Sequence, residues 1–68
     1  MTTIKITTEF IRLDSLLKLT GLVDTGGQAK IMIQNGEISV NGEPCTMRGK
    51  KLRPGDIVAC GGKQFQVE

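Results

Sequence analysis

Histidine, tryptophan and tyrosine are absent from this 68-residue sequence, and the only aromatic residues are Phe10 and Phe65. Without histidine, no imidazole is available to activate a cysteine as a nucleophile. Metal binding is disfavoured as well, because neither a CxxC pair nor a histidine cluster supplies further ligands. We therefore expect a protein that is not an enzyme and that holds no cofactor or metal.

Cysteine is scarce too, with only Cys45 and Cys60, whereas a disulfide framework in so short a chain usually has four or more. We interpret both as half-buried strand thiols in a reducing cytosol. No apolar run approaches the ~20 residues that a membrane span needs, and the N-terminal residues 1–5 lack the core of a signal peptide. These absences predict a soluble, cytoplasmic protein with no membrane partner.

The length suits one domain over residues 1–68, and a chain this short buries only about 60% of the surface that its unfolded form exposes. Its core is expected to be a single layer, without room for a deep catalytic cavity. The net charge is only +2, from nine basic and seven acidic residues. Residues 48–53, here called the basic segment, hold four of those nine cations and no acid. One surface should therefore be far more basic than the average.

A first helix is predicted from leucines at positions i, i+3 and i+4, which form one apolar stripe. These are Leu13, Leu16 and Leu17. Asp14 and Lys18 lie four apart with the acid first, the favourable order for a surface ion pair. Gly21 is expected to end this helix in a left-handed conformation.

A second helix is predicted after residues 25–28, Thr-Gly-Gly-Gln, which fit a capping box. Asn35-Gly36 should end it. Ile31 falls off its apolar stripe and is expected to be exposed or to touch a neighbouring element. The stripe itself is Ala29, Met32 and Ile33, with Gly27, Lys30 and Gln34 on the opposite face.

The remaining sequence predicts strands. Residues 3–8 alternate apolar and polar side chains, and Asn41-Gly42 is a strong signal for a two-residue hairpin turn. Pro44 cannot donate to a ladder, so the return strand should be short or lie at an edge. The predicted strands are 3–8, 37–40, 43–46, 57–60 and 63–67, with a turn at 54–56 and Gly61-Gly62 inside the last hairpin. The class is α+β, with two helices packed on a small antiparallel sheet of hairpins.

From Arg12 onward, the order of short motifs resembles the S4 RNA-binding domain, over about residues 10–60. The motifs are Arg12-Leu13-Asp14, Leu16-Leu17-Lys18, Gly21-Leu22-Val23, Gln28-Ala29-Lys30 with Ile33 and Gly36, Val40-Asn41-Gly42, and Leu52-Arg53-Pro54-Gly55-Asp56-Ile57-Val58. Residues 25–30 and 48–52 look like the small free-standing bacterial subgroup, which is implicated in binding ribosomal RNA or in ribosome maturation. The resemblance implies an S4-like (αL) fold and a structured RNA, ribosomal RNA in particular, as the partner.

One departure from the family pattern concerns the start of the second helix. Typical S4 domains carry a Ser-Arg pair there, and the matching positions here are Thr25 and Gly26. The basic side chain is missing, so that family contact does not carry over. Two glycines at a helix N-terminus instead leave backbone amides accessible to a phosphate.

The predicted RNA-binding surface combines the second helix with the basic segment. Arginine can grip a phosphate with two parallel hydrogen bonds, whereas lysine acts as a point charge. Two phenylalanines are too few for stacking of single-stranded bases, so we expect a monomer that recognises the shape and backbone of structured RNA. The candidate residues are Arg12, Gly26, Gly27, Gln28, Lys30, Gln34, Arg48, Lys50, Lys51 and Arg53.

Two alternatives belong to other classes of protein. A ubiquitin-like sulfur carrier has a similar length and similar turns, here Asn41-Gly42-Glu43 and 55–58. Its chemistry needs a C-terminal Gly-Gly, whereas this sequence ends Gln66-Val67-Glu68 and its Gly61-Gly62 lies inside a predicted hairpin. A protein–protein adaptor that uses the same surface is the second alternative, and it would show no salt-sensitive affinity for RNA.

Overall fold

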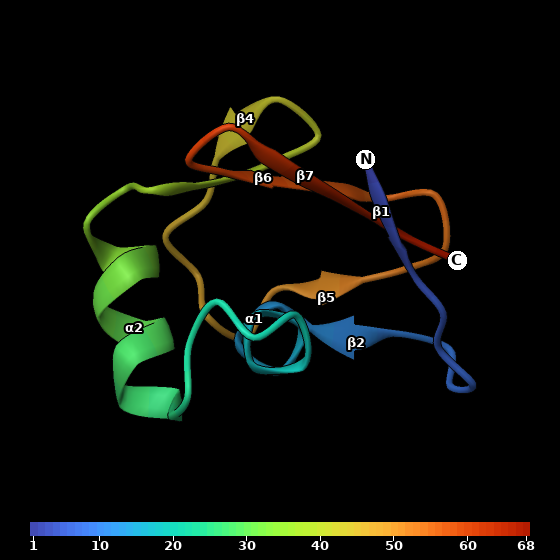
Figure 1. Cartoon of the computed structure of the whole chain (residues 1–68), viewed down its shortest axis with the longest axis horizontal. Coiled ribbons are helices and arrows are strands. Elements are labelled where there is room, and N and C mark those ends of the chain that lie inside the picture. Colours follow the sequence, from blue (N-terminus) through green and yellow to red (C-terminus); the bar gives the residue numbers. More distant parts are fainter.

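Two helices and seven strands make up the computed structural model, which describes residues 1–68. In chain order the elements are β1 (Thr2–Ile4), β2 (Ile11–Arg12), α1 (Leu13–Leu19), α2 (Gly26–Gln34), β3 (Ile38–Val40), β4 (Glu43–Pro44), β5 (Lys51–Leu52), β6 (Ile57–Cys60) and β7 (Lys63–Val67). Figure 1 shows the larger sheet on one side of the molecule, with α1, α2 and the short β2–β5 pair on the other. The predicted α+β class is confirmed.

Both helices begin and end where their sequence signals lie. Gly21, directly after the C-cap of α1, has a φ of 82°, the left-handed conformation that glycine adopts without strain. At the start of α2, the hydroxyl oxygen of Thr25 accepts a hydrogen bond from the amide of Gln28 at 3.2 Å. Asn35 is the C-cap of α2, as predicted.

The larger sheet has the strand order β1-β7-β6-β3-β4. Its hairpins are antiparallel, but β1 pairs with β7 in parallel, so the sheet is mixed rather than wholly antiparallel as predicted. The first strand also ends at Ile4 instead of Thr8. Beyond it, the amide of Ile6 still donates to the Glu68 carbonyl at 3.0 Å. Alternation along a strand shows which residues face the core, but it does not show which strand lies alongside or in which direction.

The two predicted hairpins are both present. Asn41 and Gly42 have φ angles of 52° and 86°, the positive values that a type I′ turn requires between twisted strands. The return strand β4 is only two residues long and lies at the edge of the sheet, which suits Pro44. Gly61-Gly62 connects β6 with β7, inside the second hairpin.

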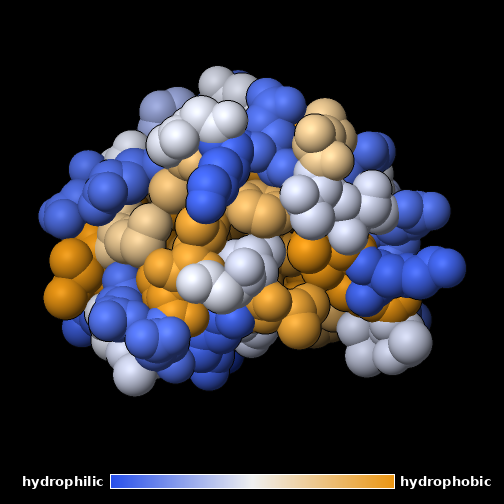
Figure 2. Space-filling model, viewed as in Figure 1, coloured by the Kyte–Doolittle hydropathy of each residue, from blue (hydrophilic) through white to orange (hydrophobic).

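The core lies between the helices and the larger sheet. Leu52 and Val67 belong to it although the helical and strand patterns did not single them out, whereas Met32, from the predicted apolar stripe of the second helix, is only partly buried. The eight largest fully buried side chains are Leu13, Leu16, Leu17, Ile33, Ile38, Leu52, Val58 and Val67. On the face seen in Figure 2, apolar groups gather in the middle and hydrophilic groups surround them.

The thiols are both unpaired, and only one of them is half-buried as predicted. Cys45 is partly exposed, whereas Cys60 is buried in β6. Burial raises the pKa of the Cys60 thiol, which keeps it protonated near neutral pH. Neither helix is long and apolar enough to cross a membrane.

Candidate nucleic-acid interface

The basic segment is not a free loop, because part of it forms the strand β5. This strand pairs antiparallel with β2 in a separate two-stranded ribbon, in which Ile11 lies opposite Leu52 and Arg12 lies opposite Lys51. Leu52 is fully buried, while Arg12 and Lys51 are exposed. Since successive side chains of a strand point to opposite faces, one face of the ribbon packs on the core and the other presents cations to solvent.

The start of α1 fixes the backbone of the basic segment. The amide of Leu13 donates to the Lys50 carbonyl at 2.9 Å, and the amide of Asp14 donates to the Arg48 carbonyl at 3.1 Å. These amides belong to the first turn of a helix, where backbone N–H groups have no partner within the helix. The carbonyls of the basic segment therefore accept hydrogen bonds from amides of the first turn of α1, while the side chains of Arg48 and Lys50 remain exposed.

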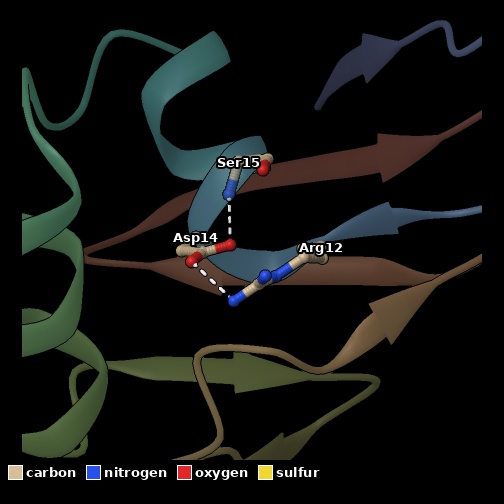
Figure 3. A network of polar contacts seen from close by, with 3 residues as sticks. All are labelled: Arg12, Asp14 and Ser15. Carbon is tan, nitrogen blue, oxygen red and sulfur yellow. Dashed lines mark hydrogen bonds and ion pairs between the residues drawn. The ribbon is translucent and has the colours of Figure 1, made fainter.

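Arg12 is held by an acid in the first turn of α1 (Figure 3). Its Nη2 lies 3.2 Å from Oδ2 of Asp14, while Oδ1 of Asp14 accepts a hydrogen bond from the amide of Ser15 at 2.8 Å. The predicted pair between Asp14 and Lys18 is thus not formed, because this local contact and the hydrogen bond from Ser15 occupy the carboxylate. The Arg12 side chain is still 52% exposed and keeps further N–H donors for a ligand.

Arg53 is placed by the turn at residues 53–56. The amide of Arg53 donates to Oδ2 of Asp56 at 2.8 Å, and Nδ2 of Asn41 donates to Oδ1 of the same carboxylate at 3.1 Å. The hydrogen bond from Arg53 is the main reason why the pKa of Asp56 lies below its usual value, and Asn41 and the nearby charge of Lys50 lower it further. Asp56 is thus ionised at neutral pH and holds the turn that carries Arg53.

Three predicted cations meet at one open hollow of about 640 Å³ on the surface. Lys50, Lys51 and Arg53 line it, together with Asp56 and residues of the β3–β4 hairpin and the chain that follows it, including Cys45. Arg12 lies next to this group, opposite Lys51 on the ribbon and beside Gly49, where a Cβ added to the glycine would lie 3.7 Å from Nη2 of Arg12. The structure therefore brings four candidate cations of β2 and the basic segment together.

The candidates on α2 form a separate part of the predicted surface. Lys30 and Gln34 are exposed, and a side-chain atom at Gly26 would meet nothing within 4 Å, so the start of this helix is open. Gln28 is engaged at the start of α2, but its Oε1 accepts from the amide of Asp24 and not from that of Thr25, so only the Thr25 half of the predicted capping box is formed. No residue of α2 lines the hollow, although Figures 1 and 3 both show the chain between β4 and β5 passing between α2 and the ribbon.

Phe10 is a neighbour of these cations that sequence reasoning did not select. Nζ of Lys51 lies 5.0 Å from the centroid of its ring, within the range of a cation–π interaction. No clear signal in the sequence marked this neighbour, because Phe10 and Ile11 are both apolar and each strand of the ribbon is only two residues long.

The structure is thus a small α+β domain with a group of exposed cations, and hydrogen bonds hold the backbone of the basic segment in place. A family model described as "S4 domain" matches residues 4–68. The chain belongs to the S4 domain family. This membership leaves the sulfur-carrier alternative without support.

Relatives and a solved structure agree with this assignment. The chain is 45% identical over 65 residues to "Probable ribosome maturation protein RlbA" of Bacillus subtilis, which covers 94% of this chain and 92% of that protein. It is 36% identical over 53 residues to the small ribosomal subunit protein uS4 of Akkermansia muciniphila, covering 78% of this chain and 26% of that protein. The solution structure of YbcJ from Escherichia coli, described as revealing an ALFAL motif involved in RNA binding, matches with a TM-score of 0.73 at 35% identity, covering 98% of this chain and 86% of that one.

Proposed function

We propose that this protein binds structured RNA, with ribosomal RNA as its ligand, and that it acts in ribosome assembly or maturation. The proposal is based on a cluster of four exposed cations, Arg12, Lys50, Lys51 and Arg53. Hydrogen bonds from the start of α1 and to the carboxylate of Asp56 fix the backbone of the basic segment, to which three of them belong. A backbone that is already fixed loses little conformational entropy on binding, and phosphate contacts supply much of the affinity for nucleic acids.

Membership in the S4 domain family and the names of the relatives support RNA as the partner. The mode of recognition that we propose is shape and backbone contact by a monomer in the cytoplasm. The only aromatic residue near the cations is Phe10, whose ring already lies beneath Lys51, so a platform for stacked bases is missing from this surface.

The test is fluorescence anisotropy with a labelled RNA stem-loop and with oligouridine, each at several salt concentrations. We expect binding to the stem-loop that weakens steeply with salt, and weaker binding to oligouridine. Crosslinking in cells, followed by sequencing of the attached RNA, should then recover ribosomal RNA. Binding of a protein partner without any salt-sensitive affinity for the stem-loop would contradict the proposal and favour the adaptor alternative.

A further inference from the structure

The cross-strand register places two cations directly opposite each other on the β2–β5 ribbon. Arg12 pairs with Lys51, and the hydrogen bond from the Leu13 amide to the Lys50 carbonyl occupies the next position of the ladder. In an antiparallel pair, hydrogen-bonded and non-hydrogen-bonded positions alternate. Arg12 and Lys51 therefore fall at a non-hydrogen-bonded position, where facing side chains lie closest together.

Like charges at such a position destabilise a sheet. Only Arg12 has a carboxylate within ion-pair distance, through Asp14 at 3.2 Å. Lys51 has none, and its ammonium group lies over the ring of Phe10 instead. The ring attracts a cation through its quadrupole but carries no net charge, so the positive charge of Lys51 is held in place without being neutralised.

Phe10 lies on the same side of the ribbon as the two cations. Phe10 directly precedes β2, and its contact with Nζ of Lys51, 5.0 Å from the ring centroid, places the ring on the side that carries the cations. Its ring is half-buried, so it gives Lys51 a fixed support. An aromatic side chain can hold the ammonium group over the ribbon, where an aliphatic one would leave the four-carbon stem of lysine free to move.

We propose that one phosphate group of the RNA binds between Arg12 and Lys51, and that Phe10 is a positioning residue that holds Lys51 for this contact. The inference rests on the proposed function and assigns one phosphate subsite within it. A phosphate between the two side chains gives Lys51 the anionic partner that it lacks. It also offsets the electrostatic repulsion between Arg12 and Lys51, which lie opposite each other in the ribbon. Arg12 contributes the N–H groups that Asp14 leaves free.

The first test separates one shared phosphate from two separate ones. Affinity for a fluorescein-labelled RNA stem-loop is measured against salt for the native protein, Arg12→Gln, Lys51→Gln and the double variant. A shared phosphate predicts that the double variant lowers the slope of log K against log salt by about 0.7–0.9, the value for one contact. A decrease of about twice that value would show two separate phosphates and overturn the shared subsite.

The second test concerns Phe10. Phe10→Leu should weaken binding about two- to fivefold, the range for an exposed cation–π contact, while Phe10→Tyr keeps the native affinity because it keeps the ring. In the Lys51→Gln background, Phe10→Leu should have no further effect. An equal loss of affinity in both backgrounds would mean that Phe10 acts through the fold and not through Lys51, and would overturn its positioning role.

Controls distinguish this inference from the proposed function. Lys63→Gln removes an exposed cation from the start of β7, outside the ribbon and the basic segment, and should bind like the native protein. If the native protein does not bind the stem-loop at low salt, the proposed function fails. If it binds and the Arg12 and Lys51 variants match Lys63→Gln, the function stands and the subsite is wrong. Melting temperatures of all variants confirm that each is folded.

Discussion

Asn41 and Asp56 join the tip of the first hairpin to the turn that precedes the second. Nδ2 of Asn41 donates to Oδ1 of Asp56 at 3.1 Å, and Oδ1 of Asn41 accepts from the amide of Ile57 at 2.9 Å. The other oxygen of Asp56 accepts from the amide of Arg53. A single carboxylate thus connects the β3–β4 hairpin with the end of the basic segment.

Protonation of Asp56 should weaken the fold at low pH. Because the pKa of Asp56 is lower in the folded protein than in the unfolded chain, its carboxylate stabilises the fold above the unfolded pKa. This contribution is lost as the pH falls below ~4 and through the folded value. Urea unfolding between pH 7 and pH 3 should show a smaller pH dependence for Asp56→Asn than for the native protein. The two proteins losing stability in parallel would contradict the assignment.

The burial of Leu52 should make the ribbon part of the cooperative fold. Leu52→Ala removes a fully buried side chain, so it should lower the free energy of unfolding by about 2–5 kcal/mol. Met47→Ala is the matched control, because Met47 is 65% exposed and should change stability by about 0.5 kcal/mol or less. Chemical denaturation measures both. A small effect of Leu52→Ala would mean that β5 packs loosely on the core.

The exposed face of α2 is the part of the interface that can be tested independently of the basic segment. Lys30→Glu should weaken binding to the RNA stem-loop without lowering the melting temperature, because Lys30 is exposed and the buried residues of α2 are Ala29 and Ile33. Lys18→Glu makes the same charge change on α1 and is the control. Equal losses of affinity in the two variants would indicate a general charge effect rather than a contact on α2.

Local signals explain why much of the fold could be predicted from the sequence. The Thr25–Gln28 cap, the Asn41-Gly42 turn and the glycine after α1 each depend on residues a few positions apart. Their hydrogen bonds and backbone angles are set by the residue types themselves, and the structure confirms all three. The outline of two helices followed by hairpins came from these features.

Non-local pairings explain what the sequence did not show. The β2–β5 ribbon has two residues in each strand, too few for a periodic pattern, and its register joins distant parts of the chain. The same ribbon decides which cations lie together, so the approach of Arg12 to Lys51 and the position of Phe10 could not be derived from spacing.

Contact between the basic segment and RNA phosphates is tested best by the salt dependence of RNA affinity. The protein to compare with the native one is a triple variant, Arg48→Ala with Lys50→Ala and Lys51→Ala. The backbone hydrogen bonds from α1 to this segment do not involve the side chains, so the variant should keep its fold. We predict weaker binding to unrelated structured RNAs and a salt slope lower by about 0.7–0.9 for each phosphate that the variant no longer binds. A folded triple variant with the native affinity and the native salt slope would show that the basic segment does not bind RNA phosphates.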